Sequence, residues 1–299
     1  MNIIILGAGA IGSLYGAKLS KLNDVVLVGK KRHVDAISRK GLKVTGFENK
    51  TYKLKAAAKI NKIEKNTLII LTTKVYDSEN AIRPIKKLLR KDAIILCLQN
   101  GYGSEDIVKK TAGKKCLVLR GVTAVGISFL KPGEIKMNNI GYTAIEKSKK
   151  SMEIAENFSE CGLKAYVSKN IKEDVWKKLI INCILNPATA ILKIKNKELA
   201  ANKFKPLRKI ISEECVKVAA KDGIMINPKF MEDSIRRIGK SENLSSMHQD
   251  LLKGKKTEIN YLNEAVVKLG KKHGIKCPVN ESLADVVKLL ETRQKQKFK

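Results

Sequence analysis

Short, continuous apolar runs recur through the first half of the chain. A segment with helical spacing, Ser13–Leu22, follows the first of them. The runs are Ile3–Leu6, Asp24–Val28, Thr67–Thr72, Ala93–Leu98 and Cys116–Leu119. Because the apolar residues are consecutive instead of alternating, these strands are expected to be buried on both faces, which is typical of a parallel sheet covered by helices. The first half is therefore predicted to be a doubly wound α/β domain.

The pattern changes near residue 168. The last strand-like run is Lys164–Val167, and from Asn170 on the apolar positions follow helical spacing with only short turns between segments. Helices are predicted at Asp174–Asn186, Phe204–Asp222, Pro228–Ile238, Glu258–Gly274 and Glu281–Glu291. The chain is thus expected to form an α/β domain (1–168) followed by an all-α domain (169–299).

The composition fits a soluble protein with two domains. Of the 299 residues 43% are apolar and 30% are charged, and this length can bury two cores. No apolar run approaches the ~20 residues that cross a bilayer. The sequence starts directly with an apolar run and a glycine turn, without a basic signal segment. A cytoplasmic protein without a membrane partner is expected.

Cysteine and histidine usage gives no sign of a metal site. Six cysteines are scattered through apolar segments without CxxC spacing, and there are only three histidines. Neither a zinc site nor a disulfide framework is expected. The cysteines are interpreted as small buried apolar residues.

The net charge of +31, from 60 basic and 29 acidic residues, is unusually high. It would suit a nucleic-acid-binding protein, but 51 of the basic residues are lysines spread along the whole chain, and aromatic residues make up only 5%. Specific nucleic-acid sites favour arginine forks and stacking aromatics. A solvated lysine-rich surface is therefore the favoured interpretation, and no nucleic-acid partner is expected. The positive field raises the local concentration of anionic substrates and cofactors.

A glycine-rich motif, Gly7-Ala8-Gly9-Ala10-Ile11-Gly12, lies between the first strand and the first helix. In this context GxGxxG is typical of dinucleotide binding. The first glycine makes the turn, the second lets the backbone approach a diphosphate, and the third allows close packing of helix and strand. The alternative is a glycine-rich turn without a ligand.

The end of the second strand bears on which dinucleotide binds. NAD sites usually carry an acidic residue there, which holds the ribose 2′-hydroxyl. This chain has Lys30-Lys31-Arg32-His33 instead, and a cationic cluster can neutralise a 2′-phosphate. NADP(H) is therefore preferred over NAD(H), although these residues also fit the interpretation as four more solvated charges.

Polar residues follow two further predicted strands. Lys74 ends the segment Thr72-Thr73-Lys74, and Asn100 precedes a glycine in Gln99-Asn100-Gly101. Ligands bind outside the carboxyl ends of parallel strands, so both side chains are placed to reach one. The alternative for the second segment is a turn that needs a positive φ at the glycine.

The segment Val175–Pro187 combines a core-like apolar sequence with a polar stripe. Lys178, Asn182 and Asn186 are spaced i, i+4 and i+8, so they share one helix face. Such a stripe must be hydrogen-bonded, either to a neighbouring element or to a polar ligand. A buried lysine can have a lowered pKa that suits a proton donor, whereas Lys177 points about 100° away. The proline after Asn186 is expected to kink or end the helix.

A second polar cluster runs from Asn243 to Asp250. Ser245 or Ser246 is expected to be an ordinary helix N-cap, with Gln249 as the capping-box partner. Thr257-Glu258 similarly resembles a helix start.

Taken together, these motifs resemble the ketopantoate reductases (2-dehydropantoate 2-reductases) along essentially the whole chain. The matching stretches are Gly7–Gly12, Thr73-Lys74, Leu98–Gly101, Lys131-Pro132-Gly133, Trp176–Leu179 with Asn182 and Asn186, Ser245–Asp250, and Thr257-Glu258-Ile259. The resemblance implies NADPH-dependent reduction of 2-dehydropantoate to (R)-pantoate, a step towards pantothenate and coenzyme A. It also implies a Rossmann domain and a helical substrate domain, with the substrate in a cleft between them. The resemblance is also compatible with a homodimer formed through the helical domain.

Individual roles follow from the resemblance by position. Lys178 resembles the general acid of the family. Substrate-binding positions are Asn100, Lys178, Asn182, Asn186, Asn196, Asn243, Ser245 and Ser246. Cofactor-binding positions are Gly7, Ala8, Gly9, Ala10, Ile11, Gly12, Lys30, Lys74, Asn100, Ala124 and Glu258. Lys30 stands where the family often has Arg, so the charge is kept and the planar fork is lost.

Two other functions fit parts of the sequence. A β-hydroxyacid or other 2-keto acid dehydrogenase shares the two-domain plan and a Lys–Asn pair on a helix, but the segments Ser245-Ser246-Met247 and Thr257-Glu258-Ile259 argue against it. A non-catalytic dinucleotide- or nucleic-acid-binding protein with the same fold is disfavoured by the presence of Lys178 and Glu258.

Overall fold

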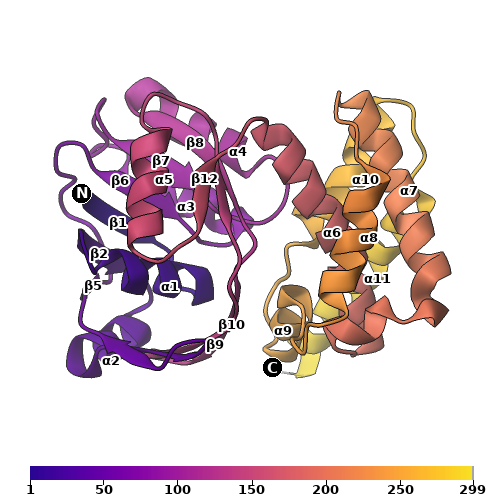
Figure 1. The fold of residues 1–299 in the computed structure, drawn as a ribbon, viewed down its shortest axis with the longest axis horizontal. Helices are drawn as coiled ribbons and strands as arrows, with labels where there is room; N and C mark the ends of the chain where they lie inside the picture. Colours follow the sequence, from indigo (N-terminus) through magenta and orange to yellow (C-terminus); the bar gives the residue numbers. More distant parts are fainter. Residues whose placement is uncertain (298–299) are drawn as a thin grey trace. The chain divides into compact units, whose positions relative to one another are not determined.

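The computed structural model describes residues 1–297, so the last two residues of the predicted helical domain lie outside the described part. The chain divides into two compact units, Met1–Ile171 and the residues from Lys172 on (Figure 1). The sequence placed the division at 168/169, a few residues earlier.

The first unit is built on an eight-stranded sheet in the order β12-β11-β8-β7-β6-β1-β2-β5. Its strands are β1 (Asn2–Leu6), β2 (Asp24–Val28), β5 (Lys55–Ala57), β6 (Leu68–Leu71), β7 (Ile94–Cys97), β8 (Leu117–Thr123), β11 (Thr143–Ile145) and β12 (Ala165–Val167). Neighbouring strands pair in parallel, except that β11 runs antiparallel to β8. The prediction of a doubly wound α/β fold is confirmed.

The helices of this unit cover both faces of the sheet. They are α1 (Ala10–Leu19), α2 (Lys31–Lys40), α3 (Ser78–Ile82), α4 (Ser104–Ala112) and α5 (Ser151–Glu160). In β1, Ile3 and Ile5 belong to one apolar cluster, whereas Ile4 and Leu6 belong to the other. Because alternate residues of one strand enter two cores, the strand has to be apolar at every position.

A second, four-stranded sheet in this unit is absent from the sequence prediction. Its order is β4-β3-β10-β9, formed by β3 (Leu42–Gly46), β4 (Lys50–Tyr52), β9 (Gly126–Lys131) and β10 (Glu134–Asn139). In β10 the buried residues Ile135 and Met137 alternate with exposed or half-buried polar ones. In a chain this rich in lysine, such half-apolar segments resemble solvated loops.

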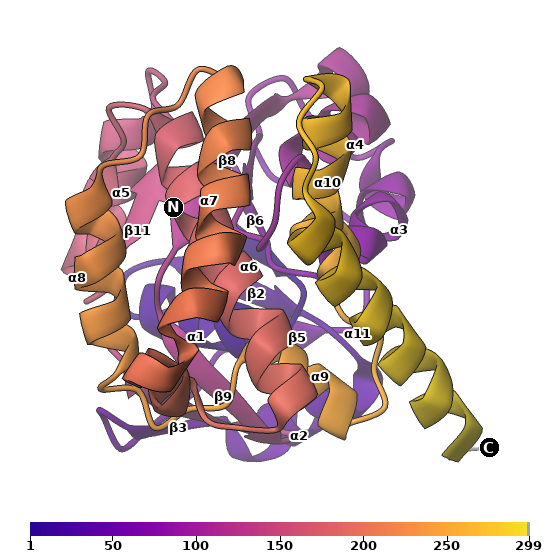
Figure 2. The ribbon, with the colours of Figure 1, turned by 90° about the vertical axis from the view of Figure 1, so that its right-hand side faces the viewer.

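The second unit is helical throughout its described residues. It consists of α6 (Ile171–Leu192), α7 (Lys205–Lys221), α8 (Pro228–Ile238), α9 (Ser246–Leu252), α10 (Asn263–Lys272) and α11 (Pro278–Lys297), with short 3-10 turns between them. Figure 2 looks onto α7, α8, α10 and α11 of this unit. The predicted helix Glu258–Gly274 is two pieces, the 3-10 turn Ile259–Tyr261 and α10, separated by Leu262.

Helix α6 is the apolar centre of the second unit. By length and composition it could cross a membrane, but 67% of its most apolar window is buried, as in the core helix of a soluble protein. Trp176 is completely buried, and its indole N–H donates to Asp222 Oδ2 over 2.8 Å.

Of the two predicted effects of Pro187, a kink or an end of the helix, the end is wrong, because α6 continues to Leu192. A proline lacks the N–H that would bond the carbonyl four residues earlier, here that of Cys183. Asn263 of α10 supplies the missing donor, with its Nδ2 3.0 Å from Cys183 O. A side chain from another helix thus replaces the lost backbone bond and allows the helix to continue.

Candidate active site

The glycine motif forms a tight turn between β1 and α1 that leaves room for a ligand. Gly7 has a φ of +111°, and a Cβ there would lie 2.6 Å from the backbone nitrogen of Thr73. A Cβ at Gly12 would lie 2.1 Å from Gly7 O, whereas a Cβ at Gly9 would meet nothing within 4 Å. The outer glycines are therefore required by packing, and the middle one faces open space, as close approach of a diphosphate requires.

The start of α1 fits a dinucleotide diphosphate. Gly9 is the N-cap and provides no side-chain cap, and the first turn carries no acidic residue. The N–H groups of a first turn lack intrahelical partners and attract anions. Backbone donors from Ala10, Ile11 and Gly12 are thus the groups that would hold the phosphates.

The basic cluster after β2 has three cationic members instead of four. Lys30 caps α2 and is exposed with Arg32, and neither has an ion-pair partner among the described residues. Lys31 pairs with Asp35 over 2.9 Å. These cations fit a phosphate group on the cofactor.

His33 does not belong with them, so its interpretation as a solvated charge is wrong. It is buried, its Nδ1 accepts from the Gly133 N–H over 2.9 Å, and its Nε2 lies 3.0 Å from Ser13 Oγ. Burial lowers its pKa, which favours the neutral ring. A neutral imidazole accepts through one nitrogen and donates through the other, so His33 joins α1, α2 and the β9–β10 turn.

The predicted contacts after the strands lie along one edge of the sheet. Lys74 follows β6, Asn100 follows β7 and Ala124 follows β8, and these strands run parallel to β1 through their neighbours. Their carboxyl ends therefore meet at the edge that carries the glycine motif. Gln99 ties two of the loops together, because its Nε2 donates to Thr73 O over 3.0 Å and reaches Lys74 O at 3.3 Å.

In the second unit, the polar stripe of α6 is present on a helix that is otherwise core. Asn182 and Asn186 are buried, and Asn182 Nδ2 has no hydrogen-bond partner among the described residues. Burial lowers the pKa of the Lys178 ammonium, and the positive charge of Arg237 lowers it further. The stripe therefore combines a lysine that gives up its proton more easily with the amide of Asn182, whose Nδ2 has no partner among the described residues.

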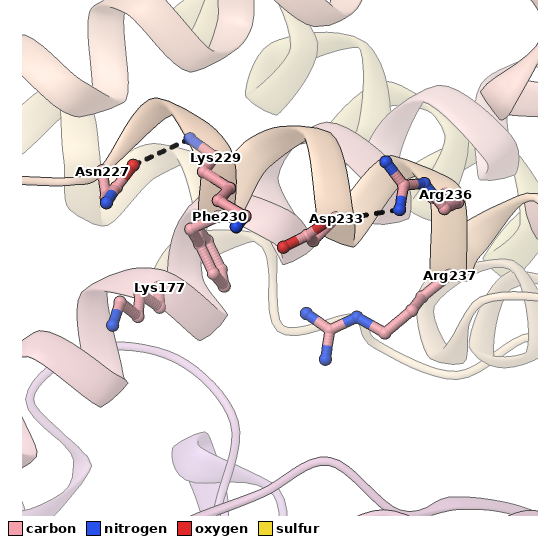
Figure 3. Close-up of a pocket in the computed structure, with 7 residues that line it drawn as sticks. All are labelled: Lys177, Asn227, Lys229, Phe230, Asp233, Arg236 and Arg237. Carbon is pink, nitrogen blue, oxygen red and sulfur yellow. Dashed lines mark hydrogen bonds and ion pairs between the residues drawn. The ribbon is translucent and has the colours of Figure 1, made fainter.

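Lys177 has different surroundings from Lys178. Its Nζ pairs with Glu173 Oε1 over 2.6 Å and lies 5.6 Å from the ring centre of Phe230. It lines an open groove of about 550 Å³ between α6 and α8, shown in Figure 3, with Asn227, Lys229, Phe230, Asp233, Arg236 and Arg237. Arg236 pairs with Asp233, whereas Arg237 extends away from it and donates to Ser234 Oγ.

Two other predicted substrate residues are adjacent in this unit. The Asn196 N–H donates to Asn243 O over 2.9 Å. Asn196 is 8% exposed, and its Oδ1 has no hydrogen-bond partner among the described residues. A buried carbonyl oxygen without a donor is costly, so this atom marks a place where a ligand donor would fit.

The predicted cap at the start of α9 is Ser245. Its Oγ accepts from the His248 N–H over 3.2 Å and is hydrogen-bonded to Thr189 Oγ1 over 2.8 Å. Gln249 is not a capping-box partner, since its Nε2 donates to Leu244 O. Ser245 is buried and its hydroxyl is used within the unit, whereas Ser246, in the first turn, is exposed.

Glu258 lies just before the 3-10 turn Ile259–Tyr261 and is 6% exposed. Thr257 fixes the backbone beside it, because its Oγ1 accepts from the Ile259 N–H and its own N–H donates to Glu291 Oε1 over 2.7 Å. The backbone on both sides of Glu258 is thus fixed by hydrogen bonds of Thr257.

Comparison with known proteins gives the same division into two parts. Residues 3–150 match the family described as "Ketopantoate reductase PanE/ApbA", and residues 170–291 match "Ketopantoate reductase PanE/ApbA C terminal". The "2-dehydropantoate 2-reductase" of Pyrococcus abyssi is 35% identical over 99% of this chain and 100% of its own length. The chain belongs to the ketopantoate reductase family. The protein of the same name from Archaeoglobus fulgidus is 34% identical over 97% of this chain and 98% of its own.

Solved structures of the ketopantoate reductase family and its relatives share the fold. A PanE/ApbA family ketopantoate reductase from Ralstonia eutropha superposes with a TM-score of 0.89 at 29% identity, over 99% of this chain and 100% of that chain. D-mandelate dehydrogenase, in a ternary structure with NADH and anilino(oxo)acetate, gives a TM-score of 0.90 at 30% identity over 99% of each chain. The family reduces small molecules with a dinucleotide.

Two arginines of this family member escaped the sequence analysis. The positive charge of Arg237 lowers the pKa of Lys178, and Arg120 is buried and hydrogen-bonded to the loop that carries Asn100. One signal could have found Arg120, because the chain has only nine arginines against 51 lysines, and this one stands within an apolar strand. A buried arginine is rarely placed without partners.

Proposed function

We propose that this protein catalyses the NADPH-dependent reduction of 2-dehydropantoate to (R)-pantoate, a step towards pantothenate and coenzyme A. The observation that carries the proposal is the stripe of Lys178, Asn182 and Asn186 on the apolar helix α6, in a chain that matches 2-dehydropantoate 2-reductases over its full length. A polar stripe that the unit itself does not fully satisfy needs a polar ligand.

Lys178 is the proposed general acid. When bound, a nicotinamide would supply a hydride to C2 of the keto acid, and negative charge would then develop on the carbonyl oxygen. The Lys178 ammonium stabilises that charge and transfers a proton to the oxygen, so the product is the neutral hydroxyl and the lysine leaves the step as a free amine. Its lowered pKa makes the proton easier to transfer.

The substrate is proposed to be held by amide and hydroxyl groups. Asn182 Nδ2 is a buried donor and Asn196 Oδ1 a buried acceptor, neither with a partner among the described residues. A substrate with a carboxylate, a carbonyl and a hydroxyl can satisfy both. Asn100, Asn186 and Asn243 are proposed further contacts. At the start of α9 the exposed hydroxyl of Ser246 is better placed than that of Ser245, which is already bonded.

The cofactor is proposed to be held by the first unit and to be NADPH. The glycine motif would bind the diphosphate, and Lys30 with Arg32 would bind a 2′-phosphate. Lys74, Asn100, Ala124 and Glu258 are proposed for the nicotinamide end. Cations without ion-pair partners at the end of β2, and no acidic residue there, favour NADPH over NADH.

A dehydrogenase of another 2-keto acid is the second candidate. The likeness to D-mandelate dehydrogenase, solved with NADH, favours this alternative, because its TM-score of 0.90 is as high as the 0.89 of the ketopantoate reductase from Ralstonia eutropha. Both reactions use a 2-keto acid, so the general acid and the amides suit either one. The two candidate reactions differ in the side chain of the substrate and in the cofactor, so these two properties distinguish them.

Initial rates with four pairs of reactants test the function. Oxidation of NADPH and of NADH is followed by absorbance with 2-dehydropantoate and with phenylglyoxylate. The highest kcat/KM is expected for 2-dehydropantoate with NADPH. A higher value for phenylglyoxylate with NADH would establish the second candidate instead, and steeply salt-dependent DNA binding without reductase activity would revive the non-catalytic alternative.

Replacing Lys30 tests the cofactor. Lys30→Glu puts a carboxylate where the 2′-phosphate is proposed to bind, so the ratio of kcat/KM for NADPH over NADH should fall by tenfold or more or reverse. Lys50→Glu, an exposed lysine of β4, is the matched control for the loss of positive charge and should leave the ratio unchanged. Equal kcat/KM for both cofactors in the parent protein would contradict the 2′-phosphate argument.

The cytoplasmic location and the formation of a homodimer stay predictions.

A further inference from the structure

Arg120 of β8 is a charged residue inside the core of the first unit. Its side chain is 4% exposed, and its neighbours Leu119 and Val122 are buried apolar residues of the same strand. Removing a guanidinium from water is costly unless it is paired and hydrogen-bonded inside the protein. The partners of Arg120 therefore show what the residue does.

The guanidinium binds three backbone carbonyls of one short segment. Its Nη1 donates to Cys97 O over 3.1 Å and to Gln99 O over 2.8 Å, and its Nη2 donates to Gly101 O over 2.9 Å. Two of these carbonyls directly flank Asn100. The planar fork of an arginine can bind several carbonyls at once, and a lysine ammonium cannot reproduce that geometry.

An acidic side chain balances the buried charge, although Arg120 Nε itself makes no hydrogen bond among the described residues. Arg120 Nε lies 3.4 Å from Glu105 Oε2, which comes from the first turn of α4. The backbone N–H of Arg120 donates to Glu146 Oε2 over 2.7 Å. The backbone of Arg120 is thus bound to Glu146, while its fork binds backbone carbonyls on both sides of Asn100.

The same segment is coupled to the neighbouring loop. Gln99, whose carbonyl Arg120 binds, uses its side-chain Nε2 to reach Thr73 O at 3.0 Å and Ser78 Oγ at 2.8 Å. The clamp therefore extends from β8 through the loop after β7 to the loop after β6. These loops carry Asn100 and Lys74.

We propose that Arg120 is a positioning residue that sets the orientation of Asn100 for the reaction without touching substrate or cofactor. The proposal rests on the proposed function in one respect, because it uses Asn100 as a site residue. The proposed link between Arg120 and Asn100 is mechanical. If the fork is lost, the backbone carbonyls at 99 and 101 lose their donors, and the side chain between them loses its defined direction.

A double-mutant cycle tests the link. Arg120→Lys keeps the charge beside Glu105 and loses the fork, and it should lower kcat at least tenfold while the affinity for NADP⁺ at the glycine motif changes little. Asn100→Ala should lower kcat by a comparable or larger factor. Because Arg120 acts through Asn100, the double variant should be no worse than Asn100→Ala alone. Multiplication of the two losses would overturn the proposal.

Stability and local dynamics are measured on the same variants. Hydrogen–deuterium exchange of peptides that cover residues 98–105 should become faster in Arg120→Lys and stay unchanged in Asn100→Ala. Thr67→Val is the matched structural control, because Thr67 is buried at the amino end of β6 and donates to Glu64 O over 2.8 Å. It should lower the melting temperature without lowering kcat. An equal loss of kcat in Thr67→Val and Arg120→Lys at equal destabilisation would refute a specific role.

The outcome can be separated from that of the proposed function. If the parent protein reduces none of the tested keto acids, the proposed function fails. The exchange measurement still decides about the clamp, because unchanged exchange at 98–105 in Arg120→Lys shows that the fork does not hold the segment.

Discussion

Lys177 and Lys178 are neighbours with the same side chain and different surroundings. Lys177 is bound by Glu173 and lies against Phe230, whereas Lys178 has no ion-pair partner among the described residues and faces the charge of Arg237. The helical period alone separates the two, since adjacent residues point about 100° apart. The expected difference in function between Lys177 and Lys178 therefore comes from a shift of one position along the helix.

Lys178→Ala should lower kcat by about 10²–10⁴-fold, the usual effect of losing a general acid. Affinity for NADPH, measured by fluorescence titration, should be nearly unchanged. Lys177→Ala removes the same charge from the adjacent position and should retain most of the parent activity. If the Lys177 variant were the crippled one, both the helix register and the assigned acid would be wrong.

Arg237 should set the alkaline limit of activity. A general acid must be protonated, so kcat falls as the pH rises through the pKa of Lys178. The Arg237 charge lowers that pKa. Arg237→Met should therefore move the alkaline limb of the kcat profile to higher pH. The matched control is Arg236→Met, because Arg236 pairs with Asp233; it should leave the alkaline limb in place. A shift to lower pH would contradict the electrostatic contact.

Among the elements, α6 shows how a rule of local structure is overridden. Pro187 predicts an interruption, but Asn263 replaces the lost backbone donor and the helix continues. The residues after Pro187 therefore stay helical as far as Leu192. No pattern within the helix predicts this replacement hydrogen bond, because the donor lies 80 residues away in the sequence.

Asn263→Leu should destabilise the second unit by about 1–3 kcal/mol, the cost of leaving a buried carbonyl without a donor. In a Pro187→Ala background the new backbone N–H can bond Cys183 O, so the same substitution should cost less. The single tryptophan of the chain, Trp176, is buried in α6 and reports unfolding of this unit by fluorescence. Equal costs in both backgrounds would show that Asn263 does not compensate for the proline.

The elements also show which patterns can be interpreted from sequence. The central strands are buried on both faces and therefore apolar throughout, so β1, β2, β6, β7 and β8 were found. In β3 and β10 buried residues alternate with exposed or half-buried ones, and no residue of β9 is fully buried, so the strands of the second sheet lack a continuous apolar run.

The candidate site divides in the same way. The glycine motif and the stripe at Lys178, Asn182 and Asn186 follow from local spacing. Asn196 and Asn243 came only from the family resemblance, since their pairing joins two loops. Arg120 was missed because its role depends on the carbonyls of another strand.

For the whole molecule, the net charge of +31 should act on anionic reactants at a distance. The Debye length falls from about 30 Å at 0.01 M salt to about 10 Å at 0.1 M. The kcat/KM for NADPH should therefore fall between these concentrations, and that for NADH should fall less because NADH lacks the 2′-phosphate. Stopped-flow association rates with each cofactor check this. Rates that do not depend on salt would show that the lysines have no role in capture.

The order of strands in the first sheet determines when β1 gains its second partner strand during synthesis on the ribosome. β1 lies between β2 and β6, so its second partner begins 40 residues after β2 ends, at Leu68. At roughly 5–20 residues per second, this side of β1 waits about 2–8 s for its partner during synthesis. The apolar run Ile3–Leu6 is an open sheet edge for that time, and it is the segment of a nascent chain that a chaperone would have to shield.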